Sequence, residues 1–292
     1  MGQAALSPLG GEFALLGDQK GHQNNPHVAL AGPGGFVVWQ TATESDSTER
    51  IMVQRLGADM TGVGVSARLS QSAERWNELN PRVALLADGG AVVVWVEGPR
   101  SSTDIYFRLL DGNGNFLGAP SLANSYLKGN QNAPVVATLS TGELVILWTS
   151  LGQDDEGTGV YGQVITKNGA RVGGEFRVNQ AQQGNQSAPS LVALDNGRFV
   201  VAWVNEVVAG RTLAGAQNLR GNLMGRIFDS QGRPLGNEYQ LNDGQGVGFS
   251  PALGTGPDGG FALAWAERDE ENMRNLSDIY TRTFNDSGLP LG

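Results

Sequence analysis

The chain has no cysteine among its 292 residues, so it forms no disulfide bond and offers no thiolate for catalysis or zinc binding. Histidine is almost as scarce: only His22 and His27 occur, and neither a nucleophile elbow nor metal-ligand spacing accompanies them. No apolar run approaches the ~18 uninterrupted residues of a membrane-spanning helix. These absences exclude thiol chemistry and membrane insertion.

Basic residues are also in deficit. The chain has 20 Lys and Arg against 29 Asp and Glu, which gives a formal charge of −9. Nucleic-acid binding depends on basic side chains that neutralise phosphates, so this balance argues against it and against anionic membrane surfaces. The first residues have neither a basic start nor a long apolar run, so no signal peptide is predicted from them.

The chain repeats one sequence pattern five times. In each copy a Pro opens a short apolar strand, and a Trp ends the next strand 13 or 14 residues later. The prolines are Pro26, Pro81, Pro134, Pro189 and Pro251, and the tryptophans are Trp39, Trp95, Trp148, Trp203 and Trp265. Because each Trp ends its strand at the same register, we expect all five to pack in the blade cores and not to form a ligand cage. A period of 53 to 62 residues predicts stacked or radial repeat units.

Each copy reads as four short strands, which we name A to D. In the fourth copy they are expected at 189–194, 199–203, 223–228 and 238–242. The middle of strand A is small, as at Ala29, Ala84 and Ala137, which suits sheets that converge on a common axis. The sequence therefore predicts an all-β fold: a single five-bladed β-propeller over residues 1–292, with a β-sandwich or a linear β-array as the alternative.

The two ends of the chain carry matching text. The chain stops at Pro290-Leu291-Gly292, where a strand D should begin, and the N-terminus reads PLGGEF from Pro8 to Phe13. The equivalent internal text is PLGNEY, from Pro234 to Tyr239. We therefore expect residues 12–16 to be the missing strand D of the fifth blade, which would close the ring and remove an open sheet edge.

A Gly follows 13 residues after the start of strand C in every copy, which indicates a backbone position where a Cβ would not fit; these are Gly64, Gly118, Gly173, Gly236 and Gly292. The repeat is recognisable from the texts "GGEFRVN…GNQSAPSLVALDNGRFVVAW" at 173–203 and "GTGVYGQ" at 157–163. It resembles the ~55-residue β-propeller-type repeats of secreted bacterial proteins, including adhesin-like and calcium-binding, RTX-associated ones. The resemblance implies an extracellular or periplasmic location, with any signal peptide already removed. It implies no particular chemistry.

The B–C connections vary most between copies, which indicates that their face carries the function. The longest follows Trp203 and contains Arg211 and Arg220, which makes it a candidate lid or contact ridge. A tolerated insertion is the alternative reading of this loop.

The D–A connections, on the same face, hold a second motif just before each Pro. Its predicted ligand-binding members are Asn77, Glu78, Asn130, Gln131, Asn185 and Gln186, with Gln23 as the first-blade equivalent and Trp76 beside Asn77. A ring of amides with an aromatic plate suits sugar hydroxyls. The alternative is that the amides bond backbone between blades, and that Trp76 is a packing plug.

Metal binding has weak support, and no metal ligand or cofactor is assigned. Asp111, Asn113 and Asn115 offer oxygens at alternate positions, as calcium loops do, but Asp-Gly-Asn is also ordinary turn chemistry. The run Asp154-Asp155-Glu156 is a second acidic cluster, expected at the surface.

These observations favour a non-enzymatic recognition module that binds carbohydrate or a protein partner through the variable face. A docking subunit of a larger extracellular assembly is the alternative. A glycoside hydrolase ranks last, because such enzymes need two opposed carboxylates and Glu78 is the one acidic residue found at the start of a strand A.

Overall fold

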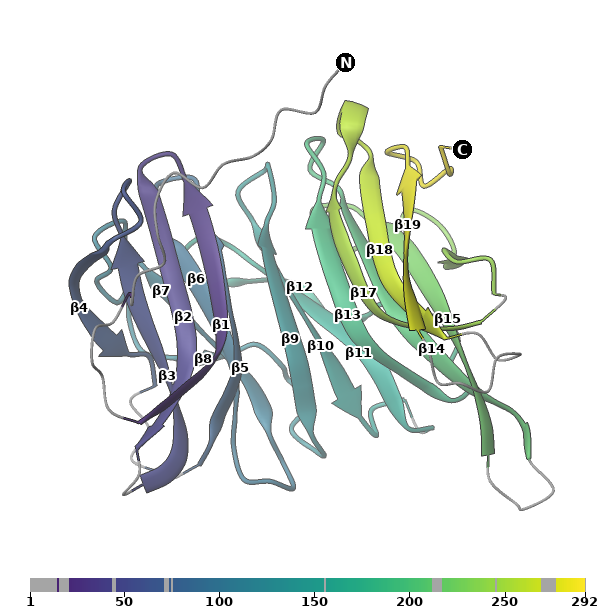
Figure 1. Ribbon diagram of the computed structural model, residues 1–292, viewed down its shortest axis with the longest axis horizontal. Helices are drawn as coiled ribbons and strands as arrows, with labels where there is room; N and C mark the ends of the chain where they lie inside the picture. Colours follow the sequence, from purple (N-terminus) through teal and green to yellow (C-terminus); the bar gives the residue numbers. More distant parts are fainter. Residues whose placement is uncertain are drawn as a thin grey trace.

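The protein is all-β in its computed structural model, which describes residues 15, 21–43, 46–70, 74, 76–154, 156–211, 217–244, 246–268 and 277–291. Nineteen strands in this part form five antiparallel sheets, and each sheet holds consecutive strands of the chain. We call the sheets blades 1 to 5. Figure 1 shows them following one another in chain order around the molecule. No helix in the described part is long and apolar enough to cross a membrane.

The first three blades each have four strands. Blade 1 contains β1 (His22–Ala31), β2 (Gly34–Thr43), β3 (Asp46–Leu56) and β4 (Gly62–Arg68). Blade 2 contains β5 (Glu78–Leu85), β6 (Ala91–Glu97), β7 (Asp104–Leu110) and β8 (Ser121–Leu122). Blade 3 contains β9 (Gln131–Thr138), β10 (Leu144–Leu151), β11 (Thr158–Ile165) and β12 (Arg171–Arg177).

The last two blades differ from each other in strand number. Blade 4 contains β13 (Asn185–Ala193), β14 (Phe199–Arg211), β15 (Gln217–Phe228) and β16 (Tyr239–Gln240). The described part of blade 5 has three strands, β17 (Val247–Thr255), β18 (Phe261–Arg268) and β19 (Ser277–Phe284), with a short 3₁₀ turn at Pro257–Gly259.

The five repeated tryptophans lie in the core, as the sequence predicted. Trp95, Trp148 and Trp203 are fully buried, and Trp39 and Trp265 nearly so. The tryptophans of blades 2 to 5 pack in apolar clusters that join each blade to the one before it. The fixed register at which Trp ends strand B therefore repeats one packing contact between neighbouring blades.

The Pro column marks a recurrent bulge in strand A. The residue before each Pro has a positive φ, between 48° and 53°, at Asn25, Asn80, Ala133, Ala188 and Ser250. The pairing of strand A with strand B shifts register at this point in every blade. A bulge bends the strand and lets its first residues turn toward the loops of the variable face.

The repeated Gly of the C–D turn has a different cause from the one its recurrence indicated. A Cβ would meet nothing within 4 Å at Gly64, Gly118, Gly173 or Gly236, so crowding does not explain the residue. The first three have φ between 66° and 91°, a conformation that Gly adopts without strain. Gly292 lies outside the described residues.

Blade 5 and blade 1 do not show the packing found between the other neighbours. At the start of strand C, Ile51, Ile105, Val160 and Leu223 are fully buried, but Ile279 is 74% exposed. None of the apolar clusters among the described residues joins β17–β19 to β1–β4. The predicted closing strand at 12–16 lies outside the described residues, apart from Leu15.

Candidate functional site

A pocket of about 680 Å³ opens between blades 1 and 2 on the variable face. Its walls come from the start of β3, the connection into β5, and the loop after β6. Trp76 lies in this wall and is 36% exposed. The other lining residues are Ser47, Thr48, Asn77, Leu79, Gly98, Pro99, Arg100 and Thr103. An exposed indole with hydroxyl, amide and guanidinium groups around it suits a sugar ring.

The asparagines before strand A hold neighbouring blades together. Asn77 accepts a hydrogen bond from the backbone N–H of Glu49 at 3.0 Å, and Asn130 accepts one from Thr103 at 3.2 Å. Asn185 accepts a bond from the Thr158 N–H at 3.3 Å. Each bond joins strand A to the start of the preceding strand C. This is the alternative that the sequence left open, in which the amides bond backbone between blades.

The glutamines that follow are fully buried. The Gln131 amide donates to the Lys128 carbonyl at 3.0 Å. Gln186 donates to Asn205 at 2.9 Å and accepts from Asn179 at 2.9 Å. In blade 1, Gln23 is exposed and its amide donates to the Gly21 carbonyl at 3.2 Å. Ligand binding by this ring stays a prediction.

Glu78 stands where blades 3 and 4 have those glutamines, and it is also fully buried. One oxygen accepts the Ile51 N–H at 2.7 Å, and the other accepts from the Arg68 guanidinium at 2.6 Å. In blades 2, 3 and 4 an Asn just after strand D makes the contact that Glu78 makes with Ile51, as Asn124 does for Ile105 at 2.8 Å. Blade 1 has Ser70 there, so a carboxylate from blade 2 takes over the contact.

A second carboxylate lies directly opposite Glu78. Glu97 pairs with it across β5 and β6, so both side chains project from the same face of blade 2. Glu97 accepts hydrogen bonds from Trp95 Nε1 at 3.0 Å and from Ser70 at 3.3 Å. Burial raises the pKa of Glu78, the bonds from Ile51 and Arg68 oppose that shift, and the charge of Glu97 adds to it.

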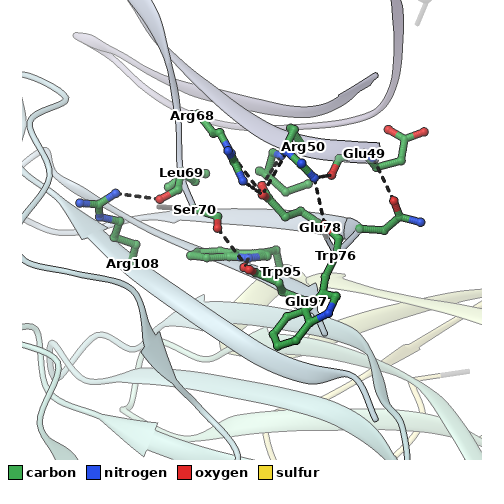
Figure 2. Close-up of polar contacts among 12 residues, drawn as sticks. Glu49, Arg50, Arg68, Leu69, Ser70, Trp76, Glu78, Trp95, Glu97 and Arg108 are labelled. Atoms are coloured by element: carbon green, nitrogen blue, oxygen red, sulfur yellow. Dashed lines mark hydrogen bonds and ion pairs between the residues drawn. The ribbon is translucent and has the colours of Figure 1, made fainter. Parts of the chain in front are cut away.

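Arg50 connects this carboxylate pair to the pocket. Its guanidinium donates to the Trp76 carbonyl at 2.9 Å and lies 3.9 Å from Glu78. Figure 2 shows Arg50 and Arg68 turned toward Glu78 from above, with Trp76, Trp95 and Glu97 below them. Both arginines contact Glu78, and Arg50 also binds the backbone of Trp76, which lines the pocket.

The long loop after Trp203 is mostly a β-hairpin, where the sequence predicted a lid or ridge. Strands β14 and β15 extend well past the blade, pairing Arg211 with Gln217 and Arg220 with Val207. Figure 1 shows this hairpin projecting from blade 4. The side chains of both arginines are outside the described part.

The Asp111 turn is built as a structural turn. Asp111 accepts the N–H groups of Asn113 and Asn115 at 2.9 and 2.8 Å, and the Asn115 amide at 2.8 Å. Asp229 accepts the equivalent pair of backbone bonds in blade 4, and Asn285 does so in blade 5 without any charge. Because an amide serves as well as a carboxylate, the pattern reflects the turn rather than an ion.

Sequence reasoning missed Glu97, Arg50 and Arg68. A signal for Glu97 was present, since Trp-x-Glu recurs as Trp95-Val-Glu97 and Trp265-Ala-Glu267. Nothing in the sequence showed that Arg50 and Arg68 converge on Glu78, because they come from separate strands of blade 1. Glu78 is still the one acidic residue at the start of a strand A, and the carboxylate that neighbours it comes from strand B of the same blade.

No family model matches the sequence, and no curated protein matches it. Solved structures do match the fold. The GH93 α-L-arabinofuranosidase of Fusarium graminearum, in complex with arabinobiose, has a TM-score of 0.57 at 12% identity, over 88% of this chain and 80% of that one. The Penicillium chrysogenum α-L-arabinanase, also with arabinobiose, gives 0.53 at 13%, over 91% and 94%. A Dyadobacter fermentans protein of unknown function gives 0.62 at 11%, over 93% and 81%.

These comparisons define the chain as a propeller-type all-β protein similar in fold to carbohydrate-acting enzymes. They correct two predictions. The resemblance to adhesin-like and calcium-binding secreted repeats was wrong, because the similar structures include arabinofuranosidases and arabinanases. The non-enzymatic reading, with a hydrolase ranked last, was also wrong, because the solved structures that share this fold include arabinofuranosidases, an arabinanase and a family-43 glycoside hydrolase.

Proposed function

We propose that the protein is a glycoside hydrolase whose saccharide substrate lies against Trp76 in the pocket between blades 1 and 2. One observation carries this proposal: blade 2 places an exposed indole beside two carboxylates, Glu78 and Glu97, which face each other across paired strands. A pair of carboxyl groups near a sugar plate is what glycoside hydrolysis needs. The similar folds whose structures hold arabinobiose support a saccharide as substrate.

The two carboxyl groups have different surroundings, which sets their roles in the proposal. Glu78 is the general acid, because burial raises its pKa and favours the protonated form that gives its proton to the leaving oxygen. Glu97 accepts hydrogen bonds from Trp95 and Ser70, and in the proposal its carboxylate stabilises the positive charge that develops on the sugar. Water then attacks the anomeric carbon, and its proton returns to the Glu78 carboxylate.

Both carboxylates are buried, so substrate reaches them only when Arg50 moves aside. Arg50 bridges the Trp76 backbone and Glu78: its guanidinium donates to the carbonyl oxygens of Trp76 at 2.9 Å and Glu49 at 3.1 Å, and it lies 3.9 Å from Glu78. A sugar stacked on Trp76 competes for the same space. Arg50 is thus a gate in the proposal, and Arg50→Ala should raise the rate on short substrates.

The test is hydrolysis of arabinan and other plant polysaccharides by wild type, Glu78→Gln and Glu97→Gln. Glu78→Gln keeps the shape of the side chain, and the chain already carries Gln at this position in Gln131 and Gln186. The variant should fold and lose hydrolysis at least 100-fold, the lower end for losing acid catalysis.

Glu267→Gln is the matched control. Glu267 accepts the Trp265 indole N–H at 2.9 Å in blade 5, just as Glu97 accepts the Trp95 indole in blade 2. It should lose stability and keep activity. Equal activity loss in Glu97→Gln and Glu267→Gln, matched by equal destabilisation, would show that both glutamates only support the fold.

We also propose that residues 12–16 close the ring as strand D of blade 5. Leu15 contacts Val37, Trp39 and Leu56 of blade 1. In the same manner Val178, which follows the matching text GGEFR, packs with Trp203 of the next blade. The Val178 N–H also donates to the Val160 carbonyl at 2.9 Å, and Ile279 is the equivalent of Val160. Closure would cover the exposed Ile279.

A further inference from the structure

The loop between β10 and β11 contains a buried charge with no partner. Asp154 is 4% exposed, and neither of its carboxylate oxygens has a hydrogen-bond partner. Among the described residues, no other buried carboxylate has both oxygens in this state. Removing an ionised carboxylate from water without compensation is expensive, so such a group indicates a bound water or ion.

The loop around Asp154 is held in place. The Gly152 N–H donates to the Gly157 carbonyl at 2.8 Å, and the Tyr126 hydroxyl donates to the Gly152 carbonyl at 2.8 Å. Gln153 links the loop to both sides, because its oxygen accepts from Ser150 at 2.8 Å and its amide donates to Glu175. The inward position of Asp154 is therefore built by contacts of its neighbours.

Gly159 of β11 leaves the room for this carboxylate. A Cβ at Gly159 would lie 2.6 Å from Asp154 Oδ2, so no larger residue fits there. Asp154 also lies close enough to Tyr161 that burial, and then its charge, raise the pKa of that phenol to about 12. The phenol is neutral beside Asp154, so it does not add a second negative charge.

In blades 2 and 5 the carboxylate two residues after the repeated Trp has a hydrogen-bond donor. There Glu97 and Glu267 accept the indole N–H of the repeated Trp. Blade 3 has Ser150 at that position, and the Trp148 indole N–H has no partner. In blade 3 the nearby carboxylate therefore comes from the loop after β10, and the Trp148 indole N–H does not bond to it.

We propose that Asp154 binds Ca²⁺, with the Gln153 side-chain oxygen and carbonyl oxygens of the same loop completing the shell. Ca²⁺ takes six to eight oxygen ligands and accepts amide, carbonyl and water oxygens beside carboxylates. In the described part, no three His, Cys, Asp or Glu residues group together, so neutral oxygens supply most of the shell. A single carboxylate places the affinity at the weak end, with Kd on the order of 10⁻⁴–10⁻³ M.

The experiment measures the melting temperature of chelator-treated protein during titration with CaCl₂ or MgCl₂. Calorimetric titration with CaCl₂ gives the Kd. Wild type should become more stable with Ca²⁺ and respond little to Mg²⁺, which demands stricter octahedral geometry. Asp154→Asn should lose the response. Without Ca²⁺ it should melt no lower than wild type, because it removes the uncompensated charge.

Asp111→Asn is the matched control, because Asp111 also lies in a Gly-rich turn but has its oxygens occupied by amide donors. It should keep the full Ca²⁺ response. The proposal is overturned if wild type shows no Ca²⁺ response, or if Asp154→Asn responds as strongly as wild type. It is also overturned if Asp111→Asn loses the response and Asp154→Asn retains it.

Discussion

Glu78 and Glu97 face each other on neighbouring strands, and each takes its hydrogen bonds from a different source. Glu78 is bound by Arg68 and the Ile51 N–H of blade 1, whereas Glu97 is bound by the Trp95 indole of its own strand. Two carboxylates placed side by side would repel each other. The separate partners let both stay buried.

This arrangement predicts a pH-dependent stability. Burial holds the pKa of Glu78 above its ordinary value, so the stability it contributes is complete below the unfolded pKa. That stability is lost as the pH rises through the folded pKa. Relative to Glu78→Gln, wild type should therefore lose stability as the pH rises above about 4, the ordinary pKa of a glutamate. Urea denaturation across that range measures it, and a pH-independent difference would contradict the raised pKa.

The repeated tryptophans make a second prediction about paired contacts. The Trp95 indole donates to Glu97, but the Trp148 indole N–H has no partner. Trp95→Phe leaves a buried carboxylate short of a bond, so it should cost about 1–3 kcal/mol more than Trp148→Phe. Chemical denaturation of both variants gives the difference. Equal losses would mean that the Glu97 bond contributes nothing.

Ring closure can be tested with an engineered disulfide. The chain has no cysteine of its own, so no native thiol competes with the introduced pair. In blade 3, Tyr161 pairs with Arg177, and the equivalent residues across the seam are Tyr280 and Ala14. Ala14→Cys with Tyr280→Cys should form an intramolecular disulfide on oxidation. Tyr161→Cys with Arg177→Cys is the positive control. A bond in the control alone would contradict closure by residues 12–16.

The bulge in strand A predicts a stabilising change to glycine. Ala188 has a φ of 52°, a conformation that strains residues with a Cβ. Ala188→Gly should raise the free energy of unfolding by up to about 1 kcal/mol. Ala193→Gly, farther along β13 and with no positive φ, should lower it by about 0.5–1 kcal/mol. Thermal melts compare the two, and destabilisation of both would show that the Ala188 φ costs nothing.

The repeat revealed the architecture because it fixes local contacts that recur. The spacing of Pro and Trp gave five units, four strands in most of them, and the burial of Trp39 and its equivalents. The bulge before each Pro was not foreseen. Sequence rules bias a residue before Pro toward extended backbone, and only the paired strands show that Asn80 or Ala133 departs from it.

The candidate site was only partly predictable, for reasons visible in particular residues. Trp76 stood out because it is outside the repeated column, and it does line a pocket. The contacts of Glu78 depend on Arg68, which lies in another blade. They also depend on Ser70 of that blade, which stands where blade 2 has Asn124 and leaves the Ile51 N–H to Glu78, a consequence that only the packing of the two blades shows. Of the acidic run expected at the surface, Glu156 is exposed but Asp154 is buried, because Gly159 makes room for it.

The account rests on catalysis in the pocket between blades 1 and 2, and turnover is its most direct test. The measurement is the release of new reducing ends from a panel of arabinans and other polysaccharides by wild type, Glu78→Gln and Glu267→Gln. The account predicts that wild type and Glu267→Gln hydrolyse the same substrate and that folded Glu78→Gln does not. Unchanged hydrolysis by folded Glu78→Gln, or no hydrolysis by wild type of any saccharide that it binds through Trp76, would contradict it.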